Sequence, residues 1–409
     1  MSIGPIFSQL RRNKLGAVLI ALQMALTLAV LANAVFIIQQ RAALMRSPSG
    51  LDEPDIFVIS NQWLRSADDA VARLESDLAT LRKLPGVADA YATNSYPMHD
   101  SGSMRRLFLA ANQSEATTLA AVYVGDNHAL STLGLKLIAG RNFTPEELGA
   151  NTPPDSPPED HIASIIITRD LAQKLYPGVN AVGRKVYFDS THVVTIVGVV
   201  QTLLVPWASS GGWFPASRGR SMLWPLKHAG QQTIYAVRAQ PGQLARVRAA
   251  VPDALYAIDR ARILGATQTM AYVRHDIFRL DRAFVVMLIV VCGVMLAVTA
   301  CGVVGLTSYW VTQRRRQIGI RRALGGTRTA IVQHFQTENL LIALAGTLTG
   351  AALGVGLNLW TVQAFESARM PVAYVIMGMV VLLALGQSAA LWPALRAASV
   401  PPALAARSL

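Results

Sequence analysis

The sequence predicts a membrane protein in which four transmembrane α-helices carry a large mixed α+β domain, inserted between the first and second helices. Three observations support this fold class. Of the 409 residues, 52% are hydrophobic and only 15% are charged, which is too apolar for an ordinary soluble protein. Four apolar runs are each long enough to cross a bilayer, which takes about 20 helical residues. Basic clusters flank these runs on one side of the membrane, as is typical of cytoplasmic segments.

The basic excess follows this topology. The formal net charge is +13, and Lys and Arg without any acid occupy the stub 1–14, the loop 310–336 and the tail 396–409. We therefore expect all three segments in the cytoplasm, with the large region and the short loop 361–372 outside. The charge also favours contact with anionic lipid in the bilayer. We expect no nucleic-acid binding, because no nucleic-acid motif accompanies the charge.

The first span covers residues 15–40, and its apolar core is Leu15–Ile38. Preceding basic residues and the sequence Ala32-Asn33-Ala34 also imitate a cleaved signal peptide. The apolar core is longer than that of a normal signal, so we favour a retained signal-anchor. Polar residues within the span are expected to face other helices rather than lipid; they are Gln23, Thr27 and Asn33.

Residues 41–280 form the non-membrane region, which mixes helices and strands. Ala67–Leu84 has apolar residues on one helical stripe, and Gly242–Ile258 is a second expected helix. The Pro-rich segment Asn151–Asp160 is expected as a solvated loop at a subdomain junction. The glycine-rich segment Trp207–Arg220 is either a partner contact or a loop whose aromatic residues pack on the core. Strands are expected at Asp55–Ser60, Val87–Asn94, Arg106–Ala110, Leu119–Val124, Ile165–Thr168, Arg184–Phe188, Val193–Val200 and Thr233–Ala239.

Three more spans follow, at residues 284–309, 338–360 and 373–395. In two of them, small residues recur at every fourth position, a spacing that lets helix backbones approach closely in lipid. The pattern predicts a tightly packed bundle or a dimer. Its residues are Gly293, Ala297, Cys301 and Gly305 in the second span, and Gly346, Gly350 and Gly354 in the third.

The loop between the second and third spans contains QRRRQIGIRRALGGTR, residues 313–328, with six arginines and no acid. The second span is expected to continue as a helix until Gly325-Gly326, because glycine readily adopts the left-handed conformation that ends helices. Thr327 is a suitable N-cap for the helix that enters the third span. We expect a helix, a break and a second helix, here called the elbow. Its candidate site residues are Arg314, Arg315, Arg316, Gln317, Ile318, Gly319, Arg321, Arg322, Leu324, Gly325 and Gly326.

Glu338 enters the third span close to the cytoplasmic face, where it either pairs with an arginine of the elbow or remains an interfacial carboxylate in water.

The sequence contains no phosphate-binding loop, no nucleophile elbow and no His-Glu-x-x-His pair. The seven histidines are scattered without ligand spacing. We therefore expect a chain that is not an enzyme and that binds no metal or cofactor.

The elbow sequence resembles the cytoplasmic loop of permeases in the MacB/FtsX superfamily, the type VII ABC transporters that work by mechanotransmission. Three further segments are similar to family segments: LGLKLIAGRNFTPEE at Leu133–Glu147, IIITRDLAQKLYPGVNAVGRKVYFDSTHVVTIVGVVQT at Ile165–Thr202, and WPALRAASVPPAL at Trp392–Leu404. The four matches occur in order and cover nearly the whole chain.

The resemblance implies four spans, a MacB-like periplasmic core domain and a dimer, formed with a second copy or with a related permease. The elbow around Arg316–Gly326 would be the coupling element that receives force from an ATPase. We expect this ABC ATPase to be a separate chain that binds the ATP. The sequence departs from the family at Gln317, where a Glu is usual, and near Pro401-Pro402, where the usual acid is absent.

The resemblance thus implies an ABC transporter permease of the bacterial inner membrane, and we expect its large domain in the periplasm. Efflux is the function we favour, with a periplasmic adaptor and an outer-membrane duct as further partners. Two alternatives remain, which are lipoprotein extraction and FtsX-like signalling to cell-wall enzymes without transport. The long external domain argues against the cell-division members, and the sequence does not specify the substrate.

Overall fold

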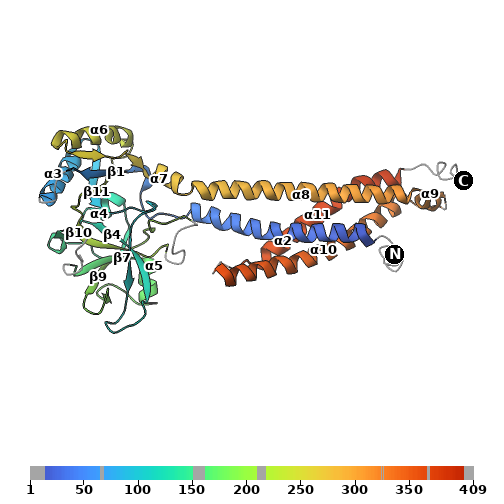
Figure 1. Ribbon diagram of the computed structural model, residues 1–409, viewed down its shortest axis with the longest axis horizontal. Coiled ribbons are helices and arrows are strands. Elements are labelled where there is room, and N and C mark those ends of the chain that lie inside the picture. Colours follow the sequence, from blue (N-terminus) through green and yellow to red (C-terminus); the bar gives the residue numbers. More distant parts are fainter. Residues whose placement is uncertain are drawn as a thin grey trace. The chain divides into compact units, whose positions relative to one another are not determined.

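The computed structural model describes residues 14–64, 69–150, 162–209, 218–323, 325, 327–365 and 369–399. The chain divides into two compact units (Figure 1). The helical unit comprises Met1–Ala43 and Arg282–Leu409, and the external unit comprises Leu44–Asp281. The residues of the helical unit include the four expected spans, and the external unit corresponds to the expected non-membrane region 41–280.

The helical unit contains four helices that are long and apolar enough to cross a membrane, counted over the described residues. They are α2 (Lys14–Met45), α8 (Arg279–Gln313), α10 (Arg328–Phe365) and α11 (Val372–Ala398), and the short α9 (Arg315–Ala323) lies between α8 and α10. Helix α10 has 38 residues, which is about 57 Å at 1.5 Å per residue. This length is nearly twice the roughly 30 Å hydrocarbon core, so α10 also extends into the aqueous phase. Together with the mixed domain between α2 and α8, these helices confirm the predicted fold class.

The first sheet of the external unit has five strands in the order β12-β1-β11-β2, with β13 also paired to β1. All its pairings are antiparallel. Helices α3 (Ala70–Lys83) and α6 (Leu244–Ile258) supply apolar side chains to a core with this sheet. The strands are β1 (Ile56–Trp63), β2 (Val87–Thr93), β11 (Gln232–Ala239), β12 (Arg262–Leu264) and β13 (Gln268–Thr269).

The second sheet has eight strands in the order β3-β4-β10-β7-β9-β5, with β6 on β10 and β8 on β9. It is mixed, since β4–β10 and β7–β9 are parallel pairs while β7–β10 is antiparallel. The strands are β3 (Ser103–Leu107), β4 (Thr118–Gly125), β5 (Leu137–Gly140), β6 (Gly149–Ala150), β7 (Ser164–Thr168), β8 (Lys185–Tyr187), β9 (Val193–Val200) and β10 (Ser221–Lys227). The remaining short helices are η1 (Glu53–Asp55), α4 (Ala129–Leu133), η2 (Pro145–Glu147), α5 (Arg169–Leu175) and α7 (Met270–Ile277).

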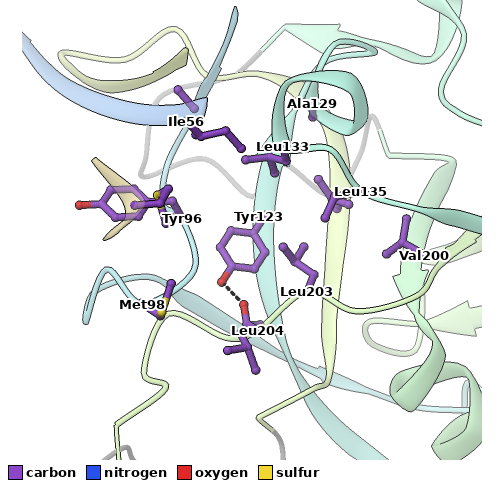
Figure 2. Close-up of a cluster of buried hydrophobic side chains, with 14 of the residues drawn as sticks. Ile56, Tyr96, Met98, Tyr123, Ala129, Leu133, Leu135, Val200, Leu203 and Leu204 are labelled. Carbon is purple, nitrogen blue, oxygen red and sulfur yellow. Dashed lines mark hydrogen bonds between the residues drawn. The ribbon is translucent and has the colours of Figure 1, made fainter. Parts of the chain in front are cut away.

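One hydrophobic cluster joins the two sheets (Figure 2). It combines Ile56 of the first sheet with Tyr123 of the second and with Leu204 of the loop that follows β9. The Tyr123 hydroxyl is buried and donates a hydrogen bond of 2.6 Å to the Leu204 carbonyl. Because a buried hydroxyl needs a partner, this bond fixes the loop against the core. The expected junction Asn151–Asp160 lies outside the described residues.

Trp207 is partly buried against the same cluster. This placement supports the simpler of the two interpretations of the glycine-rich segment, in which aromatic side chains pack on the core. The other two aromatic residues of that segment, Trp213 and Phe214, lie outside the described residues.

A fully buried ion pair connects α3 to the edge strand β12. Arg262 donates hydrogen bonds of 2.8 and 2.9 Å to the two carboxylate oxygens of Asp77, and both side chains have no exposed surface. Tyr235 donates a third bond of 2.6 Å to Asp77. The guanidinium of Arg262 also lies 4.0 Å from the ring centroid of Trp63. The charges are thus compensated, as buried charges must be.

The segment Leu133–Glu147, which carries one of the family matches, runs from the end of α4 through β5 to η2. Gly140 has a φ of +76°, and a Cβ there would lie 2.2 Å from the Val197 carbonyl oxygen, so only glycine fits. Arg141 then binds Glu147 with two bonds of 2.7 and 2.8 Å. This pairing lowers the pKa of Glu147 to about 2. Gly140 and the Arg141–Glu147 pair therefore give this part of the match a role in local folding.

Candidate functional site

The elbow is a helix with a turn at its start and a left-handed residue after its end. Arg314 occupies the turn between α8 and α9, yet its amide donates to the Trp310 carbonyl at 3.0 Å, so helical bonding continues through the turn. After α9, Gly325 has a φ of +93°, the conformation that glycine adopts most readily. Thr327 caps α10, because its Oγ1 accepts a 3.2 Å bond from the amide of Ala330.

Arg314 and Glu338 form a forked ion pair that ties the start of the elbow to α10. The Nη1 atom of Arg314 lies 2.9 and 3.2 Å from the two oxygens of Glu338, and its Nη2 atom lies 3.2 Å from Oε1. The side chains are 14% and 4% exposed. The structure thus decides between the two alternatives for Glu338 in favour of the pair. A forked, desolvated pair is among the strongest and most directional polar contacts.

An apolar contact holds α9 on its inner side. Ile318 is 5% exposed and belongs to a buried cluster with residues of α10 and α11. Gly319 is buried beside it. The other members of this cluster are Val311, Ile331, Phe335, Ala394, Ala397 and Ala398. Helix α9 is therefore held at its start by charge and in its middle by apolar packing.

The outer side of α9 presents Arg315 and Gln317, both exposed, and Ile320, which is 50% exposed. Gln317 thus points away from the bundle core, at the position where the family pattern has a Glu. The helix also contains three arginines whose side chains lie outside what the structure describes, namely Arg316, Arg321 and Arg322. Leu324 and Gly326 lie outside the described residues altogether.

The small-residue stripe of the third span packs against α2. A Cβ at Gly346 would lie 2.6 Å from the carbonyl oxygen of Ala21, and one at Gly350 would lie 2.6 Å from that of Ala25. Gly354 continues the contact one turn further. Any side chain at the first two positions would push the two helices apart, so these glycines set the spacing of α2 and α10.

The similar stripe of the second span has a different environment. A Cβ at Gly293 or Gly305 would meet nothing within 4 Å. Ala297 and Cys301 between them are exposed. Only 11% of the apolar window of α8 is buried within the chain, against 50% for α2. The same sequence pattern therefore makes a helix contact in α10 and an open face in α8.

Polar residues connect the helices within the bundle. Thr27 and Thr299 share a buried hydrogen bond of 2.9 Å, and Asn33 donates a 3.2 Å bond to the Gly354 carbonyl. Gln23 lies against Gly302. The expectation that these α2 residues face other helices is confirmed. The sequence interpretation missed a further link at 3.0 Å, from Asn339 to the Gly386 carbonyl.

Comparison with known protein families gives two adjoining matches. Residues 15–254, more than half of the chain, match the MacB-like periplasmic core domain, and residues 289–402 match the FtsX-like permease C-terminal domain. The chain belongs to the MacB/FtsX permease superfamily. As a permease of this superfamily, it is a membrane protein with an external domain, and its relatives are components of ABC transporters.

Individual relatives of this MacB/FtsX permease are distant. It is 26% identical over 230 residues to the "Macrolide export ATP-binding/permease protein MacB" of Chromobacterium violaceum, covering 55% of this chain and 33% of that protein. It is 23% identical over 312 residues to the "Uncharacterized ABC transporter permease YknZ" of Bacillus subtilis, covering 73% and 70%. The chain thus spans about one third of the first relative.

Among solved structures, the permease is similar to the periplasmic region of MacB from Actinobacillus actinomycetemcomitans. The identity is 14% and the TM-score is 0.35, with coverage of 57% of this chain and 97% of that one. Another similar structure is the extracellular domain of the transporter YknZ from Gram-positive bacteria, with 15% identity and a TM-score of 0.32, covering 51% of this chain and 99% of that one.

Proposed function

We propose that this chain is the permease subunit of a bacterial inner-membrane ABC transporter, and that a separate ATPase drives it through the elbow. The observation that carries the proposal is the double attachment of α9. Arg314 joins its start to Glu338 of α10, and Ile318 joins its middle to α10 and α11. A force applied to the outer side of α9 therefore reaches two spanning helices directly.

The proposed mechanism requires only that the ATPase binds different positions of α9 with different affinities in its different nucleotide states. ATP is bound by the partner ATPase, whose nucleotide states favour different positions of α9. The outer side of α9 carries positive charge, and no acid occurs in residues 310–336, so an acidic groove on the ATPase fits it by Arg–carboxylate contacts. Packed helices have discrete arrangements rather than continuous ones, which is how a small shift of α9 becomes a change in the external domain.

A second permease is the partner that we propose for the open face of α8. The stripe from Gly293 to Gly305 has no neighbour within 4 Å at its glycines, and small-residue stripes are common contacts between helices in lipid. The partner is a second copy or a related permease. We propose efflux as the transport function, because the name of the Chromobacterium violaceum relative refers to export, and we include a periplasmic adaptor as a further partner.

The test is to purify the chain from bacterial membranes with its co-eluting proteins, and to measure ATPase activity in nanodiscs. We expect an ABC ATPase to co-elute and to be stimulated by the permease. The double variant Arg321→Glu and Arg322→Glu should lose this stimulation while inserting normally, whereas the exposed external variant Arg248→Glu is the matched control. Normal stimulation by the double variant would overturn the proposed role of the elbow.

A further inference from the structure

The external unit contains a cavity of about 530 Å³ beside its hydrophobic core. Pockets of 300–1,000 Å³ are typical of small-molecule sites. Its wall comes from the loop that follows β2, from β13, from α7 and from the first residues of α8. Its lining includes Tyr96, His99, Asp100, Gln268, Tyr272 and Asp276.

Aromatic side chains form two sides of the cavity. Tyr96 is buried, its ring centroid lies 4.2 Å from that of His99, and its hydroxyl donates a 3.2 Å bond to Gln268. Figure 2 shows Tyr96 at the margin of the core cluster, on the side away from Leu135 and Val200. Tyr272 on α7 is 56% exposed. The Tyr96 ring is therefore held in place within the protein, and the Tyr272 ring is accessible to solvent.

The charges of the lining are mainly negative. Three carboxylates (Asp100, Asp276 and Asp281) face one guanidinium, that of Arg279. The Asp276–Arg279 contact is 4.0 Å long with both side chains more than half exposed, so it is weak. Asp281 is buried and interacts electrostatically with Arg218 from outside the lining.

Asp100 is an exposed carboxylate that makes no such contact. Its amide donates to the Pro206 carbonyl at 3.1 Å, but among the described residues no hydrogen bond or ion pair is found for its carboxylate. His99 beside it does not neutralise it, because burial lowers the pKa of that imidazole. A carboxylate without a counter-ion therefore lies at the cavity beside two tyrosines.

We propose that this cavity binds an organic ammonium group, with Asp100 as its counter-ion and Tyr96 and Tyr272 as its aromatic walls. Aromatic faces attract cations, most strongly where water is partly excluded. The apolar lining beside the rings accommodates carbon attached to the nitrogen. The inference is independent of coupling to an ATPase, because it concerns the external unit and is tested on the permease alone.

Two sources can supply this chemistry, which are a soluble amine with an apolar body and the ethanolamine headgroup of a phospholipid. The apolar run of α8 begins at Phe284, three residues after Asp281, or about 4.5 Å along the helix. Asp281, which lines the cavity, is therefore close along the chain to the start of this apolar run. The experiment must therefore separate the two sources.

The test uses the full chain in nanodiscs and a fluorescent dansyl-trimethylammonium probe, with an uncharged dansyl amide for comparison. We expect saturable binding of the cationic probe, weakened at least tenfold by Asp100→Asn and by Tyr96→Leu. The matched control is Asp253→Asn, which removes an exposed carboxylate on α6, away from the cavity. Circular dichroism of each variant establishes that it is folded.

Two results support the proposal and identify the source. Weaker probe binding in phosphatidylethanolamine nanodiscs than in nanodiscs of an uncharged galactolipid indicates the headgroup, and equal binding in both indicates a soluble amine. Two results overturn it: unchanged affinity of folded Asp100→Asn, or equal binding of the uncharged dansyl amide. Because no ATPase is present, neither result depends on the proposed function.

Discussion

Breaking the Arg314–Glu338 pair is expected to weaken both the bundle and its coupling. The change is Glu338→Gln, which keeps the shape of the side chain and removes its charge. Arg314 would then remain 14% exposed without its counter-ion. Removing one partner of a buried pair costs about 3–5 kcal/mol, because the other charge is left desolvated.

The stability part is measured as a double-mutant cycle on Arg314→Ala, Glu338→Ala and the double variant, using reversible unfolding in bicelles. Residues in direct contact show coupling energies of about 0.5–3 kcal/mol. We expect about 2 kcal/mol here, because three bonds of 2.9–3.2 Å join the two groups. Arg314→Lys should retain only part of this value, since an ammonium cannot form the fork.

The matched control is Arg315→Ala, which removes the same charge one residue further along from an exposed position. It should change stability by less than about 0.5 kcal/mol, as is usual for surface substitutions. The coupling part is the stimulation of the partner ATPase, which Glu338→Gln should reduce. An equal loss of stability in Arg314→Ala and Arg315→Ala would refute the role given to the pair. ATPase stimulation is not compared between these two variants, because Arg315 itself lies on the side of α9 that is proposed to bind the ATPase.

Three further results are expected. Oxidation in native membranes should crosslink two copies through the exposed Cys301, so Cys301→Ser should abolish the dimer band and Cys292→Ser should keep it; a band independent of Cys301 would contradict the proposed α8 contact. Asp77→Ala should destabilise the external unit by about 3–5 kcal/mol in urea unfolding, since it isolates a buried guanidinium, and a change below 1 kcal/mol would contradict this reasoning. The pKa of Glu147 is lowered from 4.5 to about 2, so its stabilising effect should be complete above pH 4.5 and lost as the pH falls toward 2; Arg141→Ala should flatten this acid limb of the stability curve, and an unchanged limb would argue against the pair.

The four spans could be predicted because a long apolar run is a strong signal that needs no neighbour. The elbow was predictable for a similar local reason, since Gly325 and Thr327 act on the backbone next to them. The contact that fixes the elbow to α10, the Arg314–Glu338 pair, could not be predicted. Six arginines are candidates by sequence for Glu338, and the rotation of α8 about its axis, which selects Arg314, is set by packing with other helices.

In the external unit, too, one element could not be predicted from local sequence. The sequence predicts no strand at 221–227, yet β10 (Ser221–Lys227) lies between β4 and β7 in the second sheet. Pro225 argues against a central strand, because it has no amide hydrogen for the ladder. In the structure, Pro225 pairs with Gly125 at the last position of the β4 register, while the antiparallel register with β7 covers only Met222 and Leu223. The proline therefore occupies a position beyond the β7 ladder, where its missing donor costs little.

The two small-residue stripes show most clearly what spacing alone can establish. Both have one small residue every fourth position, and this spacing correctly places each set on one face of a helix. Spacing does not identify the neighbour. Helix α10 has backbone atoms of α2 within 3 Å of its added Cβ positions at Gly346 and Gly350, whereas α8 has none within 4 Å at Gly293 or Gly305. A stripe already in contact within one chain cannot serve a second chain without displacing α2. Of the two stripes, that of α8 is therefore the one open to an intermolecular helix contact, and the position of Cys301 in it makes this assignment directly testable by crosslinking.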